Sequence, residues 1–204
     1  VAKKSFQISK VEGIEKLIHK AFQISNSGRK GPVVIALPED ILVKTTMQKN
    51  LSVFGIKKAM VNRGQILKIK SLLELSKKPL IILGGTNWSE NSKKNVQIFA
   101  KKNHLPVTTS FRRQDLIDNR CKNYIGTLGT SVSPKLLAAF KEADLILSIG
   151  SRLSDMSTNS FKLFNKSSEK TKLIPINPNF KEIQKVFSAE LYIETDINNF
   201  ANKM

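Results

Sequence analysis

Three segments of this 204-residue chain place glycine, arginine and hydroxyl-bearing residues directly after apolar runs. They are Gly84-Gly85-Thr86-Asn87-Trp88-Ser89, Phe111-Arg112-Arg113-Gln114-Asp115 and Gly150-Ser151-Arg152-Leu153-Ser154-Asp155. Paired glycines allow a close backbone approach, and Ser89 can cap a helix whose N-terminal amides favour a phosphate. Arginine binds phosphate oxygens in a bidentate manner. The segments therefore carry the chemistry of a dinucleotide phosphate site.

Each of these features also has a purely structural explanation. Gly84-Gly85 is not a complete G-x-G-x-x-G motif, and a tight strand-to-helix turn uses the same residues. The arginines can pair with Asp115, Asp118 or Asp155 instead of a ligand. Trp88 can stack on a flat ligand or cover a sheet, and we favour the second role.

The sequence contains no recognisable catalytic or metal-binding pattern. His19 and His104 have no partner at the spacing of a metal site. Cys121 is the only cysteine, which excludes an internal disulfide and a multi-cysteine zinc site. Neither G-x-S-x-G nor G-x-x-x-x-G-K-[ST] occurs. We therefore predict no catalytic residue and no metal ligand on this chain.

The elements that must position these segments alternate between helix and strand. Apolar spacing predicts helices over residues 66–75, 96–100, 134–140 and 183–187, and strands over residues 80–83, 107–110, 145–149, 173–176 and 191–193. This alternation predicts an α/β domain with a doubly wound, mainly parallel, Rossmann-like sheet. Ligands of such sheets bind outside the carboxyl ends of the strands, which is where the three segments lie.

The front of the chain has a different character. Residues 11–22 have helical spacing, and residues 33–37 form a continuous apolar run that is typical of a strand buried on both faces. One helix and one strand alone cannot bury their apolar faces. We therefore predict that residues 1–43 are the remnant of another α/β domain, residues 44–60 a linker and residues 61–204 the central domain. The first residue, Val1, also suggests a fragment of a longer protein.

The charge of the chain raises a second functional class. The formal net charge is +18, but lysines are scattered over every segment with no aromatic residues between them. Solvated helix faces explain this pattern better than specific nucleic-acid binding, although a basic nucleic-acid-binding protein remains an alternative. No apolar run could span a bilayer and no targeting segment opens the chain. A lone thiol fits a reducing compartment, so we expect a cytoplasmic protein without a membrane partner.

Five segments resemble, in order, thiamine-diphosphate-dependent enzymes of the acetolactate synthase type. SGRKGPVVIALPEDIL is similar to the closing strand of that family's pyrimidine-binding domain. Four more resemble successive pieces of its central domain: KKPLIILGGTNWS, FRRQDLIDNR, NYIGTLGTSVSPKLLAAFKEADLILSIGSRLSDMST and KLIPINPNFKEI. The ordered set covers nearly the whole chain. FRRQDLIDNR is nearer to the acetolactate-synthase-like members than to the biosynthetic enzyme.

The resemblance implies a fragment of a three-domain enzyme that decarboxylates 2-oxo acids or joins the resulting carbanion equivalent to a second carbonyl compound. The parent would bind thiamine diphosphate and Mg through residues that lie before Gly31 and after Met204. This chain would supply the central structural domain and be inactive alone. Its partners would be the remaining domains, in a homodimer or homotetramer.

The resemblance also bears on flavin. Some family members bind FAD at positions that match Gly84, Gly85 and Arg152. This chain has Asn177-Pro178-Asn179 where a flavin-binding member often carries an acid, so we expect no retained flavin. A free-standing FAD- or NAD-binding module that uses the same three residues is the alternative hypothesis.

Overall fold

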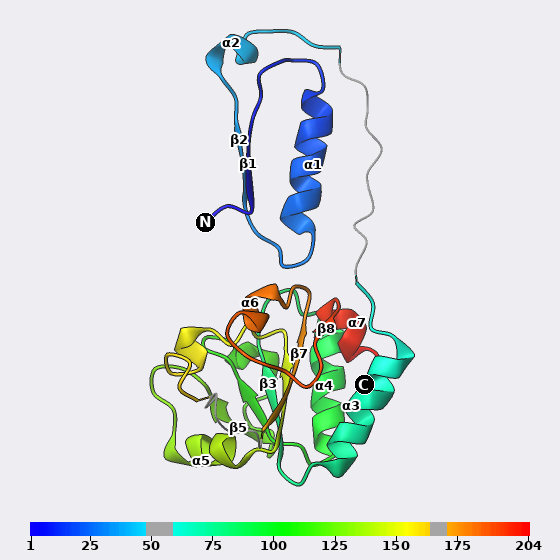
Figure 1. Cartoon of the computed structure of the whole chain (residues 1–204), viewed down its shortest axis with the longest axis vertical. Helices are drawn as coiled ribbons and strands as arrows, with labels where there is room; N and C mark the ends of the chain where they lie inside the picture. Colours follow the sequence, from blue (N-terminus) through cyan, green and yellow to red (C-terminus); the bar gives the residue numbers. More distant parts are fainter. Residues whose placement is uncertain (48–58, 164–170) are drawn as a thin grey trace. The chain divides into compact units, whose positions relative to one another are not determined.

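The computed structural model describes residues 1–47, 59–163 and 171–204. The chain divides into two compact units, Val1–Lys58 and Ala59–Met204, which we call the front unit and the central unit. Each unit is described by itself (Figure 1). The predicted linker at residues 44–60 falls mostly on residues 48–58, which lie outside the described part.

The front unit contains a strand that the sequence patterns did not predict. Strands β1 (Lys4–Gln7) and β2 (Val33–Ala36) pair in parallel, and helix α1 (Ile14–Asn26) connects them. A short helix, α2 (Glu39–Leu42), follows. β1 was missed because Lys4, Ser5 and Gln7 interrupt its apolar pattern.

The prediction that β2 is buried on both faces was wrong for this chain. Val33 and Ile35 are half-buried, whereas Val34 is 52% exposed. The paired strand β1 places Ser5 opposite Val34, so the second face of this small sheet is part polar and uncovered. A two-stranded sheet depends on packing against a helix for its stability in water, and α1 supplies that packing.

The central unit is the predicted doubly wound α/β domain, with every strand pairing parallel. Its sheet has the order β5-β4-β3-β6-β7-β8, which is the Rossmann order when the strands are counted along the chain. The elements are α3 (Arg63–Leu75), β3 (Pro79–Leu83), α4 (Glu90–Lys102), β4 (Val107–Thr109), η1 (Gln114–Leu116), β5 (Tyr124–Thr127), α5 (Pro134–Glu142), β6 (Leu145–Ile149), η2 (Asp155–Ser157), β7 (Lys172–Asn177), α6 (Lys181–Gln184), β8 (Ile193–Glu194) and α7 (Ile197–Ala201).

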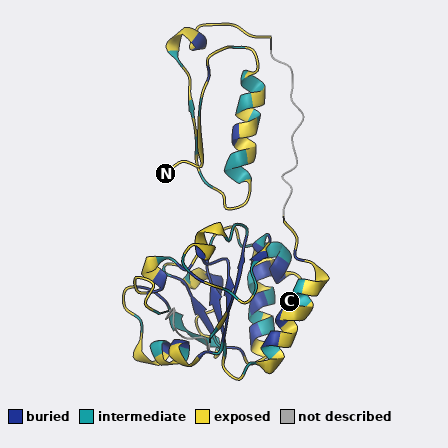
Figure 2. Ribbon diagram, in the orientation of Figure 1, coloured by how far each residue is buried: buried dark blue, intermediate teal, exposed yellow. Residues whose placement is uncertain are grey.

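The two faces of this sheet carry separate apolar clusters, because side chains alternate along a strand. Residues of α3, α4 and α7 pack on one face with Ile81 and Leu147, and residues of α5 and α6 pack on the other with Ile82 and Ile146. Figure 2 shows the buried strands between these helices. β3 and β6 are thus enclosed on both sides.

The predicted elements of the central unit are largely confirmed. Ser133 caps α5, where its hydroxyl accepts from the amide of Leu136. β5 and α7 were missed, as were the short 3-10 helices η1 and η2. β5 follows a polar stretch and has only half-buried residues, and α7 is too short for helical periodicity to be visible.

Asp144 joins the two central strands where they begin. Its carboxylate accepts hydrogen bonds from the Ser76 hydroxyl and from the amides of Lys77 and Lys78, at 2.7 and 3.0 Å for the amides. Burial works to raise the pKa of Asp144, but these hydrogen bonds hold it below its ordinary value. The start of β6 is therefore fixed to the turn before β3.

We expect the front unit to be the less stable of the two. Amides of β1, α1 and β2 should exchange with solvent at least about tenfold faster than those of β3 and β6, because the front sheet lacks covering neighbours. Hydrogen–deuterium exchange of the full chain, with its mass checked by sedimentation, measures this. Equal protection in a demonstrated monomer would contradict the prediction.

Candidate functional site

The candidate site lies at the carboxyl edge of the central sheet, between β3 and β6. The strand order reverses at this point, and ligands of open α/β sheets bind at such a switch point. The amide of Gly84 donates to Ile149 O at 2.9 Å, and the amide of Gly150 donates to Ile176 O at 2.8 Å. The fold therefore brings Gly84 and Gly85 on one loop beside the Arg152 loop, as the sequence predicted from their strand-end positions.

Glycine is required here because the two loops touch each other. A Cβ atom on Gly85 would lie 2.3 Å from Gly150 O, and one on Gly84 would lie 2.7 Å from Ser151 Cβ. Gly85 and Gly150 also have positive φ angles of 73° and 75°, where other residues are strained. The close approach that the sequence indicated is made to the neighbouring loop of the protein.

The Trp88 side chain folds back onto Gly84, the first residue of the β3–α4 loop. Its indole Nε1 donates to Gly84 O at 2.8 Å, and its ring packs against the apolar cluster of α3 and α4. This agrees with the sheet-covering role. Ser89 caps α4 by accepting from the amide of Ser92 at 3.2 Å.

The arginines of the two other loops have different environments. Arg113 forms a bidentate pair with Asp115, with Nε–Oδ1 and Nη2–Oδ2 distances of 2.9 and 3.0 Å. Arg112 has a φ angle of 61° and its guanidinium lies 5.0 Å from the centre of the Phe111 ring. Arg152 is exposed and has no hydrogen bond or ion pair with the described residues. The pairing alternative thus holds for Arg113 and not for Arg152.

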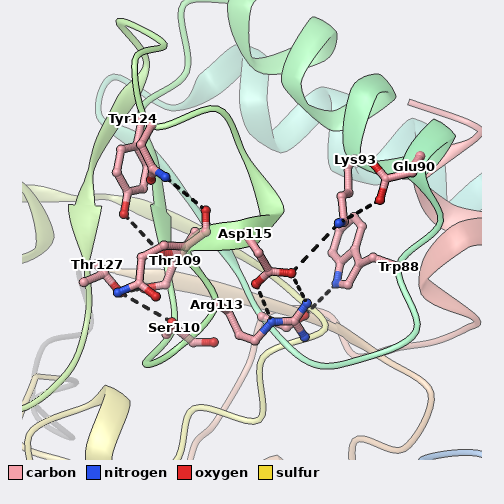
Figure 3. Close-up of polar contacts among 12 residues, drawn as sticks. Trp88, Glu90, Lys93, Thr109, Ser110, Arg113, Asp115, Tyr124 and Thr127 are labelled. Atoms are coloured by element: carbon pink, nitrogen blue, oxygen red, sulfur yellow. Dashed lines mark hydrogen bonds and ion pairs between the residues drawn. The ribbon is translucent and has the colours of Figure 1, made fainter.

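Asp115 is the centre of a small charged cluster at the start of α4 (Figure 3). Lys93 lies 2.9 Å from the carboxylate of Glu90 and 3.9 Å from that of Asp115. The hydrogen bonds from Arg113 lower the pKa of Asp115, and the positive charge of Lys93 adds to this effect. The cluster joins the loop after β4 to α4 by ion pairs within the protein.

Hydroxyl groups between β4 and β5 are likewise used internally. Figure 3 shows Thr127 and Tyr124 beside the end of β4. The Thr127 hydroxyl is within hydrogen-bond distance of Thr109 O at 3.2 Å and Ser110 O at 3.4 Å.

Asn177 stands where a flavin-binding member often carries an acid, and its side-chain amide forms hydrogen bonds within the protein. It is 4% exposed, and its Nδ2 donates to Gly150 O at 3.2 Å and Ser151 O at 3.4 Å. Its Oδ1 accepts from the amide of Asn179 at 3.2 Å. An aspartate could not donate to the two carbonyl oxygens, so asparagine suits this position.

Most polar contacts at the switch point are made within the protein, and Arg152 is the exposed exception without a partner among the described residues. No buried side-chain nitrogen or oxygen of the described residues lacks a hydrogen-bond partner. The glycine positions are filled by the opposite loop, and Asn177 has no free donor directed outward. Within residues 1–47, 59–163 and 171–204 there is also no group of three histidine, cysteine or acidic side chains that could hold a metal.

Sequence reasoning missed one contributor to this edge. Asn198 of α7 accepts from the amide of Ser89 at 2.8 Å and donates to Asn87 O at 2.7 Å. No local pattern marks this residue, because the contact spans more than one hundred positions and depends on the fold.

Comparison with known proteins places this architecture. The family described as "Thiamine pyrophosphate enzyme, central domain" matches residues 66–204. The chain belongs to this family. The match begins within α3 and includes every strand of the central sheet.

Similar proteins are acetolactate synthase large subunits. That of Buchnera aphidicola subsp. Schizaphis graminum is 32% identical over 210 residues, which cover 100% of this chain and 36% of the relative. Those of Haemophilus influenzae and Buchnera aphidicola subsp. Schlechtendalia chinensis are 31% and 34% identical, each over 80% of this chain and 30% of the relative. The chain thus spans about a third of the length of these curated relatives.

The contact between the two glycine loops predicts a large effect of a single methyl group. Gly85→Ala should destabilise the central unit by about 3 kcal/mol, because the new Cβ meets a carbonyl oxygen at a strained φ angle. The thermal midpoint of this unit should then fall by roughly 10 °C, as measured by circular dichroism.

Gly64→Ala is the matched control. Gly64 lies in the first turn of α3, and its added Cβ would come no nearer than 3.4 Å, to Asn62 Oδ1. Alanine favours a helix over glycine, so this variant should be as stable as the parent or more so. An unchanged thermal midpoint for Gly85→Ala would contradict the close contact between Gly85 and Gly150.

Proposed function

We propose that this chain is part of a thiamine-diphosphate-dependent enzyme that acts on 2-oxo acids, by decarboxylation or by carboligation, and that it supplies the central structural domain. The observation that carries the proposal is the match of residues 66–204 to the central-domain family, on a sheet with the Rossmann order. The acetolactate synthase relatives support the 2-oxo acid class, because their similarity extends over the front unit as well. When bound, thiamine diphosphate supplies the ylid and stabilises the carbanion.

The residues of this chain support a structural rather than a chemical role. At the carboxyl edge of the sheet, Arg113 and Lys93 pair with Asp115 and Glu90, and Asn177 is engaged by neighbouring backbone. We infer that thiamine diphosphate and Mg are held by residues of the parent enzyme outside this chain.

The domain assignment follows from the same family. We propose that residues 1–43 are the last part of the pyrimidine-binding domain, residues 44–60 a linker and residues 61–204 the central domain. The division of the chain after Lys58 supports this assignment. So does the small front sheet, whose uncovered face suggests that further strands and helices accompany it in the parent.

The proposed partners are the remaining domains of the parent, assembled as a homodimer or homotetramer. Phe22 and Leu42 of the front unit are 65% and 62% exposed, which supports contact with more protein. No helix in the described part of the chain has the length and apolar character needed to cross a membrane. We propose a cytoplasmic location.

Two other functions have less support. A free-standing FAD or NAD module would use Gly84, Gly85 and Arg152, but the two glycines contact the opposite loop and Arg152 alone is exposed. Specific nucleic-acid binding needs a basic face with stacking aromatic side chains, and the family match leaves this class without a supporting observation.

The first test of the proposal is catalytic silence. Purified chain mixed with thiamine diphosphate, Mg and pyruvate should release no carbon dioxide above background, because the groups that hold the cofactor lie elsewhere in the parent. A full-length acetolactate synthase assayed in parallel is the positive control. Turnover by the isolated chain would overturn its assignment as a structural part.

The second test concerns FAD. The purified chain should be colourless, and added FAD should leave its thermal midpoint unchanged, because a ligand that does not bind the native state cannot stabilise it. Arg152→Ala should behave in the same way. Arg120→Ala, in an exposed pair with Asp118, controls for loss of one charge.

A yellow protein would be evidence against this expectation. A thermal midpoint that rises with FAD in the unsubstituted chain and in Arg120→Ala, but not in Arg152→Ala, would also be evidence against it. Either result would promote the dinucleotide-binding alternative.

A further inference from the structure

Three asparagines at the end of the chain each bond to a different part of the central unit. Asn198 binds the β3–α4 loop through Asn87 O and the amide of Ser89. Asn199 Oδ1 accepts from the amide of Val61 at 3.0 Å. Asn202 Oδ1 accepts from Asn95 Nδ2 on α4 at 3.0 Å. We call Asn198, Asn199 and Asn202 the α7 clip.

The α7 clip lies beside residues 59–61, where the chain enters the central unit. Ala59 O accepts from the amide of Asp196 at 2.9 Å and from the Thr195 hydroxyl at 3.1 Å. Lys203 Nζ donates to Val61 O at 3.0 Å. Residues 59–61, which we call the incoming segment, are therefore hydrogen-bonded to residues 195–203. Figure 1 shows α7 beside the start of α3.

Apolar packing makes this connection rigid. Val61 is 1% exposed and Phe200 is also 1% exposed, and both belong to the same core cluster as Ile197. A Cβ on Gly150 would lie 2.7 Å from Ile197 Cδ1, so α7 also lies against the second glycine loop. A five-residue helix is not stable alone, so its position depends on these contacts.

We propose that the α7 clip couples the incoming segment to the switch-point loop, residues 84–89. A displacement of residues 59–61 moves α7 through Asn199, and α7 moves the loop through Asn198. Asn198 and Asn199 are thus positioning residues that let residues 59–61 set the order of the loop at the candidate site. The inference depends on the geometry of the central unit alone and holds whether or not the proposed reaction is correct.

The test is Asn199→Ala in the full chain, read at the loop that Asn199 does not touch. Exchange of the Ser89 amide should become about fivefold faster, the effect expected when one hydrogen bond is weakened. Trp88 is the only tryptophan of the chain, so its fluorescence reports on the same loop. Acrylamide should quench it more strongly in the variant than in the parent.

Two variants make the test specific. Asn199→Asp keeps the oxygen that accepts from the amide of Val61. Both signals of this variant should therefore equal those of the unsubstituted chain. Asn103→Ala removes an asparagine that binds Phe99 O at the opposite end of α4, and it should change neither signal. If Asn199→Ala does not fold, Thr195→Val removes the hydroxyl bond to Ala59 with little change of shape and serves in its place.

The proposal fails if the Ser89 amide and Trp88 keep their parent behaviour in the variant. It also fails if amides of β3 and β6 exchange faster by the same factor as Ser89, because the effect is then a general loss of stability. A failure of Asn199→Asp to restore the signals would likewise overturn it.

Discussion

The parallel pairing of β3 with β6 is the interaction on which the central unit depends. Five residue pairs join the strands, from Pro79 with Leu145 to Leu83 with Ile149, and both strands are buried on both faces. Backbone groups enclosed in this way must find their hydrogen bonds within the sheet. Asp144 fixes the pair where the strands begin, and the contact of Gly85 with Gly150 fixes it where they end.

This constraint also explains the character of the candidate site. Because the loops after β3 and β6 meet backbone to backbone, the polar groups at the edge bond to one another: Trp88 to Gly84, Asn177 to Gly150 and Arg113 to Asp115. The same fold can serve as a scaffold or a binding site, and the loops decide between these roles.

The front unit illustrates the opposite situation. The described residues of this unit include few buried apolar side chains, of which Ile8, Ala21 and Ile41 are examples. Without neighbours on the second face of the sheet, little apolar area is removed from water to offset the entropy of ordering the chain. The front unit therefore gains less stability from its own core than the central unit does.

The sequence by itself determined the α/β class, most strands of the central sheet and the strand-end location of Gly84, Gly85 and Arg152. Apolar runs and glycines are local signals that persist in any arrangement of the elements. β1 and β5 escaped detection because their side chains are polar or half-buried, so pairing with a neighbour defines them more than their own pattern does. Only the tertiary structure decided that Gly85 meets Gly150, that Asn177 holds the β6 loop and that Asn198 reaches Ser89. These contacts join positions far apart in the chain, and a hydrogen bond between distant groups exists only once the fold has brought them within about 3 Å.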